Sequence, residues 1–151
     1  MLTPEMTALI RDNTLALVAT VTPEGEPAVS PKATVVVLDP ARLVFSDLRS
    51  PGTRRNLAAN PACELAFVDV FRRKAVRVRG RGSCHARGAP EFDALLPRFT
   101  EWPDLQPRMR GIFDITITAA EMVVSPAYDL GADEAELAAQ WLTRYRKLIE
   151  G

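Results

Sequence analysis

The chain has 151 residues, and its 19 Lys and Arg residues balance its 19 Asp and Glu residues. This length suits one domain, residues 1–151, whose core buries roughly two thirds of the unfolded surface. Because the net charge is zero, composition excludes an overall field that would attract nucleic acid or an anionic membrane, and any anion-binding site must be local.

The cysteine and histidine content indicates no metal centre. Cys63 and Cys84 lie far apart, without CxxC or Cys/His spacing, which argues against both a structural zinc site and a disulfide framework. His85 is the only histidine. The N-terminus lacks a basic region followed by a long apolar run, and no stretch approaches the length of a membrane span. We therefore expect a soluble, cytoplasmic protein with reduced thiols and no metal site.

The first part of the chain predicts one helix and three strands. The segment Thr3-Pro4-Glu5 opens a helix with an N-cap, a proline at the first helical position and an acid in the first turn. Residues 15–21 (LALVATV) are short, apolar and rich in strand formers. A second strand begins near Ala28 and continues to the β-branched run that ends at Leu38, and residues 43–46 form a third. These strands predict a three-stranded meander.

A loop rich in hydroxyl and guanidinium groups follows the third strand. After Ser46 and Asp47 come residues 49–55 (RSPGTRR), and a short helical segment, residues 56–60, is ended by Pro61. N–H groups at a helix N-terminus carry partial positive charge, and Ser, Thr and Arg side chains add donors that suit a phosphate. The loop therefore predicts an anion cradle.

The second half of the chain completes the sheet and adds two helices. Residues 64–70 and 75–84 predict strands, and residues 112–124 predict the last long strand or pair of strands. Helical spacing of apolar residues predicts a middle helix at residues 88–99 and a C-terminal helix at residues 133–149. About six antiparallel strands with N-terminal, middle and C-terminal helices indicate a mainly β protein, a small barrel with peripheral helices.

Four sequence segments carry a family resemblance: SPKATVVVLDPARLVFSD, RSPGTRRNLAANP, ELAFVDVFRRKAVRVRGRG and SPAYDLG. In this order the chain resembles, over nearly its whole length, the pyridoxamine 5′-phosphate oxidase-like flavoproteins with an antiparallel split β-barrel. Members of that family are typically homodimers that hold FMN at the subunit interface. The resemblance therefore implies FMN as the cofactor and a homodimer as the assembly.

The resemblance also implies which residues lie beside the flavin ring. The family's flavin-facing strand matches residues 30–35, where alternation puts Ser30, Lys32 and Thr34 on a common side. Lys32 is unusual in a β-branched strand, and we expect it near the flavin ring or its phosphate tail. Without the family match, a lysine whose stem packs on the barrel while its ammonium reaches water would be the preferred interpretation.

The phosphate loop of the family matches the hydroxyl and guanidinium loop. Thr53 stands where many members carry a phosphate-binding Lys, so Arg49 or Arg54 would supply the charge. Asp47 would accept a hydrogen bond from a ribityl hydroxyl or cap the loop. The complete set of cofactor-binding residues implied by the match is Ser30, Lys32, Ala33, Thr34, Phe45, Ser46, Asp47, Arg49, Ser50, Thr53, Arg54 and Asn56.

An arginine stripe on the fifth predicted strand has two interpretations. Arg77, Arg79 and Arg81 alternate with apolar or glycine positions and could contact nucleic acid. A solvated strand face or a ladder of salt bridges is more common, and the stripe lacks the aromatic residues that stack on bases. We therefore expect no nucleic-acid partner.

The favoured function is that of an FMN-dependent oxidoreductase acting on an unknown small molecule by hydride transfer through flavin N5, which requires no catalytic side chain. The sequence holds no Ser-His-Asp, Cys-His or close carboxylate arrangement that would indicate hydrolysis. The substrate-reading C-terminal segment of the true oxidase is not clearly present, so pyridoxamine phosphate oxidation is not expected. Two alternatives are a flavin-binding electron carrier without a substrate, and the same barrel binding a deazaflavin or heme.

Overall fold

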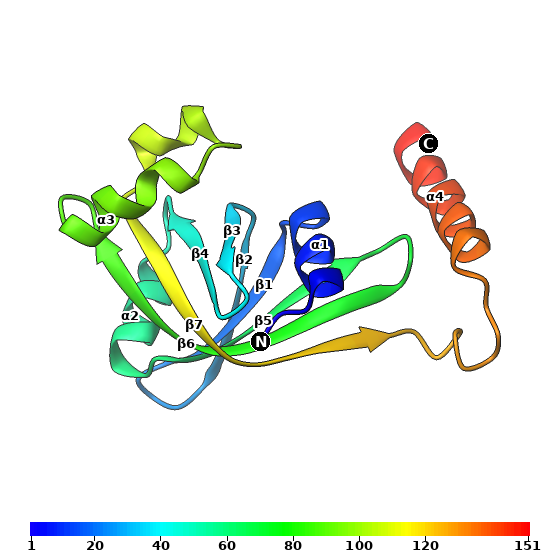
Figure 1. The fold of residues 1–151 in the computed structure, drawn as a ribbon, viewed down its shortest axis with the longest axis horizontal. Helices are drawn as coiled ribbons and strands as arrows, with labels where there is room; N and C mark the ends of the chain where they lie inside the picture. Colours follow the sequence, from blue (N-terminus) through cyan, green and yellow to red (C-terminus); the bar gives the residue numbers. More distant parts are fainter.

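In the computed structural model, which describes residues 1–151, seven antiparallel strands form one curled sheet in the order β2-β1-β5-β6-β7-β4-β3 (Figure 1). The edge strands β2 and β3 do not pair with each other, so the barrel stays open along that side. This confirms the mainly β, antiparallel split-barrel class, with seven strands where about six were expected. The strands are β1 (Ala16–Val21), β2 (Pro27–Lys32), β3 (Val35–Asp39), β4 (Arg42–Asp47), β5 (Ala62–Asp69), β6 (Lys74–Ala86) and β7 (Gly111–Val124).

The predicted three-stranded meander is wrong, because the single strand expected from Ala28 to Leu38 is two strands at opposite edges of the sheet. β2 pairs with β1, whereas β3 pairs with β4. The chain crosses from one edge to the other at Ala33 and Thr34, outside both strands. Pro27 and Pro31 of β2 have no N–H to donate to a further strand, which suits an edge position.

The chain also forms four α-helices and two 3₁₀ helices: α1 (Pro4–Asp12), α2 (Pro51–Ala59), α3 (Pro90–Leu95), η1 (Leu96–Arg98), η2 (Pro103–Arg108) and α4 (Glu134–Glu150). Thr3 caps α1 as predicted, since its hydroxyl accepts a hydrogen bond from the Met6 N–H. The helix expected from residue 56 begins earlier, at Pro51, because proline is preorganised for the first helical position. The predicted middle helix gives way to η1 at Leu96, because the next residue, Pro97, lacks an N–H for the α-helical ladder.

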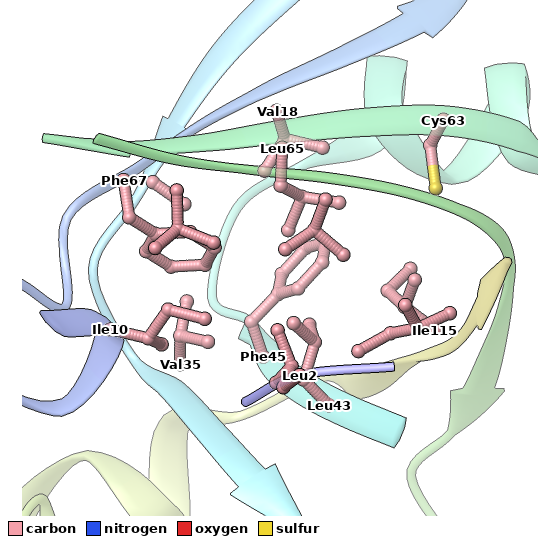
Figure 2. Packing of buried hydrophobic residues seen from close by; sticks show 14 of the residues in the cluster. Leu2, Ile10, Val18, Val35, Leu43, Phe45, Cys63, Leu65, Phe67 and Ile115 are labelled. Atoms are coloured by element: carbon pink, nitrogen blue, oxygen red, sulfur yellow. The ribbon is translucent and has the colours of Figure 1, made fainter. Parts of the chain in front are cut away.

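Two apolar clusters bury β4 on both faces. On the inner face Phe45 stacks on Phe113 with ring centroids 4.8 Å apart, among residues from most of the strands (Figure 2). On the outer face Val44 and Ile112 pack with side chains of the α3–η2 segment such as Phe92. Because successive residues of β4 enter opposite cores, the position of its C-terminal end is firmly set.

Helix α4 confirms the predicted C-terminal helix but stands clear of the barrel (Figure 1). None of its residues is buried. It contacts the turn between β5 and β6, where the Arg73 guanidinium lies 4.0 Å from the Trp141 ring centroid and Phe71 meets Tyr145 edge to face at 5.6 Å. No helix is both long enough and apolar enough to cross a membrane.

We predict that Phe45→Ala lowers the free energy of unfolding by about 3–5 kcal/mol, because it leaves a cavity in the inner core. Leu142→Ala on α4, where the side chain is 40% exposed, should change it by no more than about 0.5 kcal/mol. Urea unfolding followed by circular dichroism measures both. Equal losses for the two variants would contradict the assignment of the core.

Candidate functional site

The link between β2 and β3 is fastened to the end of β4 by two hydroxyl groups. The side-chain oxygens of Thr34 and Ser46 lie 2.6 Å apart, and the Ser46 N–H also donates to Thr34 Oγ1 at 3.1 Å. Both residues are buried. Thr34 and Ser46, predicted as site residues in separate segments, therefore meet. Their hydrogen bonds hold the link between β2 and β3 against β4.

Lys32 and Ser30, at the end of β2, form a second contact of the predicted set. The Lys32 ammonium donates to Ser30 Oγ at 2.6 Å, and the lysine is half-buried. Burial lowers the pKa of Lys32, and the negative charge of Asp47 acts in the opposite direction. The hydrogen-bond partner of this ammonium is a neutral hydroxyl, so an added anion would stabilise its charged form.

Asp47 joins the end of β4 to the first turn of α2. Its carboxylate is almost fully buried; Oδ1 accepts the Ser50 N–H at 2.8 Å, and Oδ2 accepts Arg54 Nε at 3.1 Å and Nη2 at 2.5 Å. Asp47 thus caps the loop, which is one of the two roles the sequence suggested. Because Arg54 is already paired, less of its charge is available to a ligand.

The inward side of α2 carries the polar residues Thr53 and Asn56, both buried. Asn56 donates from Nδ2 to the Thr20 hydroxyl on β1 at 3.0 Å. Its Oδ1 is buried and has no hydrogen-bond partner. A buried acceptor without a hydrogen bond is costly. A donor group of a bound ligand would remove this cost by hydrogen-bonding to the oxygen.

Three predicted residues differ from these in their surroundings. The Phe45 side chain is fully buried in the inner core, so only its main chain can reach a ligand. Ala33 and Arg49 are exposed. Arg49, between β4 and α2, forms no ion pair within the chain and offers a free guanidinium beside Ser50.

Sequence reasoning missed Arg110 and Gly111 as neighbours of Asp47. The Arg110 N–H donates to the Asp47 carbonyl at 2.7 Å, and Gly111 lies opposite Asp47 in the pairing of β4 with β7. A Cβ on Gly111 would lie 2.9 Å from Arg54 Nη2 and 3.0 Å from the His85 carbonyl oxygen. The only feature of the sequence that could have indicated this close packing was a glycine at the start of a strand.

The site offers binding groups without a nucleophile and base. The one histidine, His85, contacts Asp114 at 3.2 Å rather than a Ser or Cys side chain. No group of three or more His, Cys, Asp and Glu side chains is placed to hold a metal ion. The Lys32 ammonium, the hydroxyl groups and the N-terminus of α2 are groups of the kind that bind an anionic, hydroxyl-rich ligand.

The open barrel and its hydroxyl-lined site define a split-barrel protein. The family model of pyridoxamine 5′-phosphate oxidase matches residues 2–124, and the chain belongs to this family. Residues 125–151, which include α4, lie beyond the match. No protein with a curated function matches the chain.

Solved structures of the same fold support this assignment. HupZ from Group A Streptococcus is 30% identical with a TM-score of 0.69, and the match covers 83% of this chain and 96% of that one. A protein named pyridoxamine 5′-phosphate oxidase from Lactobacillus delbrueckii is 28% identical with a TM-score of 0.67, over 80% and 93%. An FMN-binding protein from Syntrophomonas wolfei shares the fold at 13% identity, with a TM-score of 0.65 over 80% and 84%.

We predict that Asp47→Ala lowers the free energy of unfolding by about 2–3 kcal/mol, because it leaves the Ser50 N–H and the Arg54 guanidinium without their acceptor. The control is Asp129→Ala, an exposed carboxylate without an ion pair, which should change it by about 0.5 kcal/mol or less. Denaturant titration of both variants makes the comparison. A loss for Asp47→Ala no larger than that for Asp129→Ala would contradict a structural role for the buried carboxylate.

Proposed function

We propose that the chain is an FMN-binding flavoprotein and acts as an oxidoreductase on a small molecule. The observation that carries the proposal is the half-buried Lys32 ammonium, whose hydrogen-bond partner is the Ser30 hydroxyl. Lys32 stands two residues before Thr34, whose hydroxyl contacts that of Ser46. Membership of the pyridoxamine 5′-phosphate oxidase family supports it, as does the shared fold with a protein named as FMN-binding.

The residues present fit the three parts of FMN. For the phosphate, Lys32 and Arg49 supply charge, while Ser50 and Thr53 add hydroxyl donors at the first turn of α2. This assignment answers the question raised by Thr53, because Lys32 takes over the charge that a lysine at position 53 supplies in many relatives. Arg54 contributes less, since Asp47 already holds it.

The ribityl chain and the ring have partners of their own. The unpartnered Asn56 Oδ1 can accept from a ribityl hydroxyl. The main chain of residues 30–34 and the polar side of β2 would lie along the ring. Bound FMN would supply a hydride acceptor at N5. The residues of the chain bind and orient the cofactor and shield it from water, and we assign none of them a catalytic role.

A second copy of the chain would complete the assembly as a homodimer. The outer face of the sheet exposes Leu17, Val29, Val68 and Val123. On the same face Glu64 pairs with Arg77 at 3.0 Å, so charges in its middle are already matched within the chain. An apolar sheet face with internally paired charges suits a self-complementary interface. The family resemblance implies FMN at the subunit interface, and the free thiols suit a cytoplasmic location.

We predict that Lys32→Ala raises the Kd for FMN about tenfold, equivalent to ~1.4 kcal/mol, because the phosphate loses a charge-assisted partner. Lys147→Ala, an exposed lysine on α4, is the matched control and should leave the Kd unchanged. Quenching of FMN fluorescence measures both. An unchanged Kd for Lys32→Ala would show that the lysine does not serve the cofactor.

The same titration has a predicted pH dependence. Phosphate binding requires protonated Lys32, and burial holds the pKa of Lys32 below its ordinary 10.5 in the free protein. Affinity for FMN should therefore fall as pH rises through this lowered pKa, and Lys32→Ala should lose that part of the dependence. A protein that stays colourless and takes up no FMN would overturn the proposed function itself.

Absorbance changes of the loaded protein separate an enzyme from a carrier. Reduction by NADH or NADPH, followed by reoxidation with an added acceptor, supports turnover. A protein whose cofactor exchanges electrons but converts no added substrate would instead be a carrier. A deazaflavin or heme spectrum in place of that of FMN would reassign the ligand of the barrel.

We predict that Leu17→Glu converts a two-chain assembly into single chains, because it places a charge in the apolar outer face of the sheet. Leu142→Glu on α4 is the control, since this leucine is about as exposed and lies on a different element. Sedimentation velocity measures the mass of each. A dimer that survives Leu17→Glu and dissociates with Leu142→Glu would place the interface on α4 instead.

A further inference from the structure

The outward side of α2 borders a groove that the proposed cofactor site does not use. Two adjoining hollows share Arg54 and Ala58. One, of about 410 Å³, is also lined by Ser50, Arg55 and Arg110, and the other, of about 450 Å³, by Leu57, Pro61, Gly82 and Cys84. We refer to the two hollows together as the α2 groove.

The α2 groove and the proposed cofactor site lie on different sides of the helix. Successive residues of an α-helix are rotated by about 100°. Asn56, two positions from both Arg54 and Ala58, is therefore nearly opposite them, and its side chain reaches Thr20 on β1. Lys32 does not line either hollow. The helix separates most of the two regions, and only Asp47, Ser50 and Arg54 belong to both.

One end of the α2 groove is basic. Arg54, Arg55 and Arg110 line it, and the single carboxylate among its lining residues, Asp47, is buried and already engaged by Arg54 and the Ser50 N–H. Arg55 and Arg110 are exposed and form no ion pair. Two free guanidinium groups beside a third suit the planar, two-pronged recognition of a phosphate or carboxylate.

The other end of the α2 groove is largely apolar. Leu57 and Pro61 line it, and Gly82 packs directly on the inner core, where a Cβ would lie 2.7 Å from Ile115 Cδ1 and 3.1 Å from a methyl group of Leu57. The Cys84 thiol completes the lining. Burial raises the pKa of Cys84, an effect that the nearby Arg54 partly opposes, so the sulfur is uncharged at neutral pH. An apolar surface with a neutral thiol suits a hydrophobic body such as an aromatic ring.

We propose that the α2 groove binds a second ligand, distinct from the cofactor, in which a phosphate or carboxylate is attached to an aromatic or other apolar body. The anionic group contacts Arg55 and Arg110 and the exposed side of Arg54. The apolar body lies over Leu57, Ala58 and Gly82 and covers Cys84. The ligand is recognised by its charge at one end and its shape at the other.

Cys84 provides a built-in reporter for the test. Iodoacetamide alkylates thiolates, and the rate at Cys84 is followed by mass spectrometry of its peptide in the full-length protein at mildly alkaline pH. Cys63 is the internal reference, because burial raises its pKa to about 11 and keeps it unreactive. Saturating phenyl phosphate should slow alkylation of Cys84 several-fold, and inorganic phosphate at the same ionic strength should protect much less.

Two double variants decide whether the arginines are responsible. Arg55→Ala with Arg110→Ala should abolish protection by phenyl phosphate, and both side chains are exposed, so folding is preserved. Arg98→Ala with Arg108→Ala removes the same charge outside the groove and should retain protection. Absence of protection in the unaltered protein, or equal protection in both double variants, would overturn the proposal. If inorganic phosphate protects Cys84 as well as phenyl phosphate does, the proposal that the groove also binds an apolar body is wrong.

The same experiment with FMN distinguishes this proposal from the proposed function. FMN alone should leave Cys84 reactive, and phenyl phosphate should protect it whether FMN is present or not. A protein that takes up no FMN but shows arginine-dependent protection would lose the proposed function and keep the second site. Protection of Cys84 by FMN itself would identify the α2 groove as the cofactor site and overturn the second site.

Discussion

The buried carboxylate of Asp47 is the constraint on which the site depends. A carboxylate is expensive to bury unless its oxygens are hydrogen-bonded and its charge is balanced. Both conditions are met, because one oxygen accepts the Ser50 N–H and the other accepts Arg54. These contacts fix the start of α2 against the end of β4, whose position is set by apolar packing on both faces. The orientation of every polar group on α2 follows from this junction.

The junction gives α2 two chemically different sides. Towards β1 it presents buried hydroxyl and amide groups. Towards the start of β7 it presents guanidinium groups and apolar side chains. Because Asp47 binds Arg54, one of the two arginines that the family match suggested for the phosphate is held on the outward side. A cofactor on the inward side must then rely on Lys32, Arg49 and the helix N-terminus, and the outward side remains available to another anion.

Local patterns in the sequence predicted most of the elements. The cap at Thr3, the alternation along β6 and the acidic start and apolar stripe of α4 act over a few residues, and the structure confirms them. The separation of β2 from β3 could not be found in this way, because it depends on pairing with β1 and β4 and on a clamp between Thr34 and Ser46. Continuity of strand formers does not reveal that a chain changes edge.

The same limit applies to the site. Family resemblance identified the segments that meet, and Thr34–Ser46 and Asp47–Arg54 are contacts between its predicted residues. It could not show that the Phe45 side chain enters the core, since one residue of register decides which face it joins. Arg110 and Gly111 become neighbours of Asp47 only through the pairing of β4 with β7, a contact between distant parts of the chain. Their importance follows from register, which no local pattern specifies.

A crystal structure of the full chain with FMN tests the central claim most directly. The account predicts the phosphate within hydrogen-bonding distance of Lys32 and the first turn of α2, with the ring along residues 30–34. A phosphate held instead between Arg55 and Arg110, on the outward side of α2, would contradict it.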